Sequence, residues 1–148
     1  MATRVEKQAR RLSIEMRYLE ETAEALQSRL NMVDSAMNDL ALANETLEGL
    51  KGNDEGSQLL VPIGGNSYIK AKLEDPDKVI VGMGAGVSVE KTFQEAKEVI
   101  RNRKEELEET RNSLQERFSE VAQNLNEKRT KLQELASEFR EGQPPSNV

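Results

Sequence analysis

Residues 82–86 (GMGAG) follow a predicted strand, as phosphate-binding loops do, and a phosphate site would make the chain a nucleotide-using enzyme. The spacing G-x-G-x-G lacks the third glycine that a dinucleotide-binding turn requires. Residues 87–89 (VSV) then continue as another strand, so no helix N-terminus is available for a pyrophosphate. We therefore interpret these glycines as a hairpin turn that needs positive φ.

An acidic cluster at residues 105–109 (EELEE) has the side chains that attract divalent cations. On a helix these carboxylates point in different directions, and Arg101, Lys104 and Arg111 lie within reach as ion-pair partners. We interpret the cluster as a solvated face and expect no metal site. The sequence contains no histidine and no cysteine, the commonest general base and the thiolate nucleophile. We expect neither catalytic residues nor a cofactor.

The composition is typical of a coiled coil and not of a compact globule. Of 148 residues, 32% are charged and 3% aromatic, and the mean hydropathy is -0.72. We expect a cytoplasmic protein because no apolar run is long enough for a membrane span and no signal peptide is recognisable. The net charge of -6 argues against nucleic-acid binding. Only residues 1–17, with five basic and two acidic side chains, are clearly basic, and we hypothesise that they steer acidic partners.

Two heptad repeats must position any functional residue. Their seam residues alternate at spacings of four and three, which predicts two long helices. The first series reads Val5, Ala9, Leu12, Met16, Leu19, Ala23, Leu26, Leu30, Val33, Met37, Leu40, Asn44 and Leu47. The second reads Phe93, Lys97, Ile100, Lys104, Leu107, Arg111, Leu114, Phe118, Val121, Leu125, Lys128, Leu132, Leu135 and Phe139. We predict helices over residues 1–51 and 92–141, with a capping box at Thr92 and Glu95 and a disordered tail over 142–148.

Residues 52–91 have strand and turn chemistry. Strands at 59–63 and 68–73 flank the turn 64–67, and strands at 78–83 and 87–89 flank the turn 84–86, which predicts two hairpins. Two short hairpins bury too little by themselves, so we expect a partner chain to supply a further sheet. The candidate assembly residues are Val61, Ile63, Ile69, Leu73, Val79 and Val81.

The fold class that follows is mostly α with a small β body, in which two hairpins join the helices of a long antiparallel coiled coil. This return places Asn44 beside Lys97 and Lys104. We hypothesise that these polar seam residues mark the register. The alternative is that the β body stabilises this end of the coil and tolerates them.

Ile14 and Tyr18 occupy outward heptad positions one turn apart, close to the predicted tip. They are either ordinary surface residues or a soft contact for apolar segments of another protein. Seam residues near the C-terminus either close the coil or become exposed where its end frays. The candidate client-binding residues are Ile14, Met16, Tyr18, Leu132, Leu135 and Phe139.

The central segment resembles the alpha-type subunit of archaeal prefoldin. The resemblance lies in residues 60–65 (LVPIGG), 67–71 (SYIKA), 77–82 (DKVIVG), 84–87 (GAGV) and 89–91 (VEK), and the flanking helices extend it over nearly the whole chain. Residues 65–66 (GN) differ slightly from the family pattern, which leaves the fold undisturbed.

The resemblance implies a hexamer of two alpha-type and four beta-type subunits, whose hairpins form a double β-barrel and whose six coiled coils project from it. It also implies an ATP-independent chaperone that holds unfolded polypeptides at its coiled-coil tips and delivers them to a group II chaperonin. Two alternatives remain: a structural adaptor that binds one folded partner, and a nucleotide-using enzyme.

Overall fold

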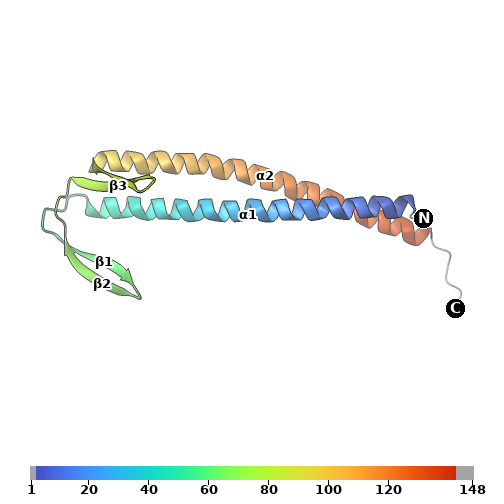
Figure 1. Cartoon of the computed structure of the whole chain (residues 1–148), viewed down its shortest axis with the longest axis horizontal. Coiled ribbons are helices and arrows are strands. Elements are labelled where there is room, and N and C mark those ends of the chain that lie inside the picture. The colour runs from blue at the N-terminus through green and yellow to red at the C-terminus, as the bar shows by residue number, and fades with distance from the viewer. Residues whose placement is uncertain (1–2, 143–148) are drawn as a thin grey trace. The chain divides into compact units, whose positions relative to one another are not determined.

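The computed structural model describes residues 3–142. Its elements are α1 (Arg4–Leu50), β1 (Gln58–Gly64), β2 (Ser67–Lys72), β3 (Lys78–Gly84), β4 (Val87–Thr92) and α2 (Phe93–Glu141) (Figure 1). The predicted fold class is confirmed, since two long helices are joined by two antiparallel hairpins. Apart from Gly142, the predicted disordered tail lies outside the described residues.

Both helices begin at a Thr-x-x-Glu sequence in which the threonine hydroxyl caps the first turn. At α2, the Glu95 backbone N–H donates to Thr92 Oγ1 (3.2 Å) and the Thr92 hydroxyl donates to Glu95 Oε1 (3.0 Å), as the spacing predicts. At α1, the Glu6 backbone N–H donates to Thr3 Oγ1 (3.2 Å) and the Thr3 N–H donates to Glu6 Oε2 (3.3 Å). The bonds at α1 satisfy two backbone N–H groups that have no partner within the helix, and those at α2 satisfy one, the Glu95 N–H.

The described residues divide into two compact units, residues 3–34 with 109–142 and residues 35–108. In the first unit, Leu26, Leu30 and Leu114 form a buried cluster between the helices. Asp34 pairs with Arg111 (2.7 Å) and Glu15 with Lys128 (2.9 Å), so residue numbers fall along α1 as they rise along α2. The two helices are therefore antiparallel in this unit.

In the second unit, the β3–β4 hairpin packs on the chain's own helices. Val81 of β3 forms a buried cluster with Leu47 of α1 and Ala96 of α2. Four half-buried apolar residues surround this cluster: Val79, Phe93, Val99 and Ile100. The prediction that Val81 needs a partner's sheet is therefore corrected for the single chain, whereas the prediction for the half-buried Val79 is left untested. Ala96 of α2 is fully buried. Its side chain is so small that α2 comes close enough to β3 to cover it.

The two hairpins have the same register. In the first, Val61 pairs with Ile69, and in the second Val81 pairs with Val89. Each pairing shifts at the same place, between positions 62 and 64 and between positions 82 and 84. The turn residues Asn66 and Ala85 have φ of 59° and 52°, and glycines with positive φ adjoin both. The turn of the second hairpin is therefore at residues 85–86, within the predicted turn 84–86, and residues 82–84 end strand β3.

The seam is shielded as the heptads predict. Every apolar position of the first series is buried or half-buried, whereas Asn44 is exposed. In the second series only Lys104 and Phe139 are exposed. Asn44, Lys97 and Lys104 line one shallow depression in the second unit, as the antiparallel return predicts.

Three of the basic seam residues bond a carboxylate on the other helix. Lys97 pairs with Glu48 in the second unit, and Arg111 and Lys128 pair with Asp34 and Glu15 in the first. Each pairing favours one alignment of the helices. Of the three residues in the register hypothesis, only Lys97 has such a bond, because Lys104 pairs with Glu108 of its own helix and Asn44 is exposed. The hypothesis therefore stays a prediction.

Candidate functional site

No group of three or more acidic side chains within residues 3–142 is arranged to hold a metal ion. In the acidic cluster at 105–109, Glu108 lies 4.0 Å from Lys104 as an ion pair one turn apart. Within the same range, neither helix contains a stretch long and apolar enough to cross a membrane.

The first unit has an apolar depression where α1 begins and α2 ends. Its lining is Val5, Glu6, Ala9, Leu132, Leu135, Ala136 and Phe139. The structure thus brings together three of the predicted tip residues, Leu132, Leu135 and Phe139. Phe139 is 41% exposed, so this seam position is open to solvent and can contact another molecule.

The other predicted tip residues lie elsewhere in the first unit. Ile14 and Tyr18 are 65% and 69% exposed, which agrees with their outward heptad positions. Tyr18 lines a separate depression with Ala25, Arg29 and Arg117. Met16 is half-buried in the seam. None of these three residues lines the apolar depression.

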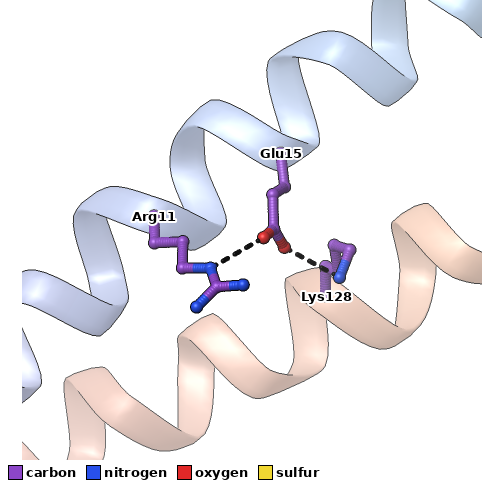
Figure 2. A network of polar contacts seen from close by, with 3 residues as sticks. All are labelled: Arg11, Glu15 and Lys128. Atoms are coloured by element: carbon purple, nitrogen blue, oxygen red, sulfur yellow. Dashed lines mark hydrogen bonds and ion pairs between the residues drawn. The ribbon is translucent and has the colours of Figure 1, made fainter.

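A second depression, which we call the cationic depression because three of its side chains are basic, adjoins the apolar one. Its lining is Gln8, Arg11, Leu12, Glu15, Lys128, Lys131 and Leu135, so that Leu135 belongs to both. Figure 2 shows Glu15 of α1 held between two cations: Arg11 Nε donates to Oε1 (3.1 Å) and Lys128 Nζ to Oε2 (2.9 Å). The bond from Lys128, and next the bond from Arg11, lowers the pKa of Glu15 because both stabilise its ionised form.

Sequence reasoning missed this cationic depression. Its signals were Lys128 at a polar seam position and Glu15 four residues after Arg11. Neither signal shows that Lys128 and Glu15 meet, because that depends on the alignment of the two helices.

The hairpins of the second unit expose a large apolar surface. Among the predicted assembly residues, Val61, Ile63 and Ile69 are exposed, Leu73 and Val79 are half-buried, and Val81 is buried. Direct cross-strand partners share a face, so Val61 and Ile69 lie on one face of the β1–β2 hairpin and Leu60 lies on the other. Six further apolar residues of the hairpins, outside the predicted set, are also exposed: Leu60, Tyr68, Ile80, Met83, Val87 and Val89.

An apolar groove also runs between α1 and β3 in the second unit. Leu40, Leu42 and Leu47 line it from α1, and Val79 and Ile80 line it from β3. Leu42 and Ile80 are 63% and 75% exposed. Soluble monomers rarely leave this much apolar side chain uncovered, so the hairpin region has the properties of an assembly surface.

Comparison with known proteins agrees with this arrangement of helices and hairpins. Residues 19–138 match the sequence family described as prefoldin subunit. The chain belongs to the prefoldin family. Prefoldin subunit alpha of Methanococcoides burtonii is 40% identical over 107 residues, which cover 72% of this chain and 78% of that protein. Prefoldin subunit alpha of Methanopyrus kandleri is 37% identical over 113 residues, which cover 76% of this chain and 72% of that protein.

A solved structure is similar as well. Filamentous PFD from Methanocaldococcus jannaschii is 28% identical, with a TM-score of 0.66 and coverage of 76% of this chain and 93% of that chain. These likenesses confirm the resemblance to an alpha-type prefoldin subunit. They give the chain a chaperone-type function, since prefoldin is a family of chaperones and not of enzymes.

Proposed function

We propose that the chain is one subunit of an ATP-independent hexameric chaperone in the cytoplasm, with two alpha-type and four beta-type subunits. It captures unfolded polypeptides at the end of the helix pair where α1 begins and α2 ends, and delivers them to a group II chaperonin. The observation that carries this proposal is the open apolar depression around Phe139, at the end of the helix pair where α1 begins and α2 ends.

The apolar depression suits non-native chains better than one folded ligand. It is shallow, and within it only the capping Glu6 carries a charge, so it offers few directional contacts that would select one partner. Its contacts are individually weak. Several copies in one assembly would bind a long unfolded chain far more tightly than any single copy does.

The hairpins support the assembly part of the proposal. Each forms a two-stranded sheet whose outer edges have no further strand among residues 3–142, and an isolated hairpin is marginally stable in water. Both faces of the β1–β2 hairpin carry exposed apolar side chains. Strands from partner subunits would cover both the edges and these faces, as in an intersubunit β-barrel.

The test mixes the full-length chain with a beta-type prefoldin subunit. We expect a complex of about six chains by light scattering, and this complex suppresses aggregation of a chemically denatured protein without ATP. Phe139→Ser should remove most of the suppression. Met32→Ser is the matched control, because Met32 is 70% exposed in the same unit and lines none of the three depressions described above.

Each part of the proposal can fail separately. A hexamer that does not protect the denatured protein contradicts client capture and favours an adaptor for one folded partner. Protection without a hexamer contradicts the subunit count. Because the similar PFD is filamentous, the chain is also measured alone, where growth beyond six subunits would replace the hexamer with a filament.

A further inference from the structure

The two depressions that share Leu135 differ in chemistry. The apolar depression contains one carboxylate, Glu6, whose Oε2 accepts the Thr3 backbone N–H in the capping box. The cationic depression contains three basic side chains, Arg11, Lys128 and Lys131, and one carboxylate. An apolar side chain is therefore favoured in the first depression and an anion in the second.

The cations of the second depression are not fully neutralised. Glu15 bonds both Arg11 and Lys128, so one negative charge faces two positive ones. Among residues 3–142, Lys131 has no ion pair or side-chain hydrogen bond and is exposed. The lowered pKa of Glu15 agrees with a positive local potential. Charge complementarity thus favours an acidic partner here, although the whole chain carries -6.

The distance between the depressions limits how a ligand can fill both. Val5 and Ala9 of α1 line the apolar depression, and Gln8, Arg11 and Glu15 line the cationic one. Their centres are offset by somewhat more than one helical turn, about 7 Å along α1. Two residues of an extended chain span about the same length.

We propose that this pair of depressions selects client segments in which an acidic residue lies about two positions from a large apolar residue. The apolar side chain enters the depression around Phe139, and the carboxylate reaches Lys131 with the nearby Arg11 and Lys128. This inference rests on the proposed function, because it names the class of unfolded segment that the same end of the helix pair captures.

The experiment uses the full-length chain and three fluorescein-labelled unstructured peptides. They are identical except at one position two residues from a leucine, which is Asp, Asn or Lys. Anisotropy titrations at low salt should show the Asp peptide binding about threefold tighter than the Asn peptide, the range of one exposed ion pair, and the Lys peptide weakest. The differences should shrink at high salt because the charges are exposed to solvent.

Two variants assign the effect to the depression. Lys131→Gln should bring the Asp and Asn peptides to nearly equal affinity. Lys7→Gln, the matched control, removes the same charge from an exposed site on α1 that lines neither depression and should leave the preference intact. Phe139→Ser should weaken all three peptides by the same factor.

The outcomes separate the two proposals. Equal binding of the three peptides overturns the acid preference but does not contradict client capture. The same conclusion follows if none of the peptides binds and the chain still suppresses aggregation. Absence of both binding and suppression overturns client capture itself. A single-stranded oligonucleotide that binds more tightly than the Asp peptide and competes with it would make this a nucleic-acid site, and the inference would be wrong.

Discussion

The β1–β2 and β3–β4 hairpins follow one plan, with a constant offset of 20 residues from Val61 to Val81 and from Ile69 to Val89. Their strands have the same lengths, their pairings shift at the same place, and both turns have residues at positive φ. Their burial differs sharply. Val61 is 44% exposed and Val81 only 8%.

The difference arises from what lies against each hairpin. Val81 packs on Leu47 and Ala96, and the Arg103 guanidinium donates to the Gly82 carbonyl oxygen (2.6 Å). The corresponding face of the first hairpin, with Val61 and Ile69, contributes nothing to the buried clusters of the described residues. One hairpin is thus part of the subunit's own fold, and its repeat presents the same kind of face to solvent.

The largest effect is expected from placing a charge at the two equivalent positions. Val81→Asp puts an unpaired carboxylate among Leu47 and Ala96, so the hairpin should detach, with a loss of about 2–3 kcal/mol in the free energy of unfolding. Val61→Asp should change it by less than about 0.5 kcal/mol, since that site is open. Urea denaturation of the isolated chain, followed by circular dichroism, measures both.

The same two variants test assembly. Val61→Asp should prevent the complex with beta-type subunits although the chain itself stays folded. Equal losses of unfolding free energy in the two variants would show that the hairpins are equally exposed, and the comparison would be wrong.

A smaller loss of unfolding free energy is expected from a larger side chain at Ala96, where α2 approaches β3. Ala96 is fully buried, so Ala96→Leu should lower the free energy of unfolding by about 1–3 kcal/mol through overpacking. Ala41→Leu is the control, because Ala41 is exposed on α1 in the same unit. A neutral result for Ala96→Leu would mean that β3 and the helix are not in close contact.

A local effect is expected from Arg103. Arg103→Gln removes the charged donor to the Gly82 carbonyl, and the half-exposed bond is worth about 1 kcal/mol, so amides of β3 and β4 should exchange about fivefold faster. Amides of β1 and β2 should be unaffected. Arg101→Gln removes an exposed arginine from the same helix and should change neither hairpin. Faster exchange in both hairpins would show that Arg103 does not act on β3–β4 specifically.

The smallest effect is expected from Glu15, which lies in the helix pair of the first unit. It tests whether a change in that unit alters the stability difference between the two hairpins of the second unit. The pKa of Glu15 is lower in the folded chain, chiefly through Lys128, so the unfolded chain takes up its proton first as pH falls. The stability that Glu15 contributes is complete above its ordinary pKa of about 4.3 and is lost as pH falls from there through the lower folded pKa.

The melting temperature should therefore fall below about pH 4.3 less steeply in Glu15→Gln than in the unaltered chain. Val61→Asp and Val81→Asp should differ in unfolding free energy by the same amount with and without Glu15→Gln. The reason is that Glu15 belongs to one compact unit and both valines belong to the other. A changed difference would show coupling between them.

Much of the fold was predictable because its signals are local. The four-three spacing from Val5 to Leu47 and the Thr92–Glu95 capping box depend only on helix geometry. The Thr3–Glu6 capping box has the same spacing and was overlooked. Among the predicted tip residues, Leu132, Leu135 and Phe139 lie together because they follow one heptad seam.

The sequence by itself determined the elements, the antiparallel return, the hairpin turns and the absence of histidine and cysteine chemistry. It did not show which hairpin is covered, because Leu59 with Val61 and Val79 with Val81 have the same period of two. Only the tertiary structure decided that Ala96 and Arg103 meet the second hairpin, and that Lys128 meets Glu15. Periodicity shows which face of an element is apolar, whereas its partner depends on contacts between residues far apart in the chain.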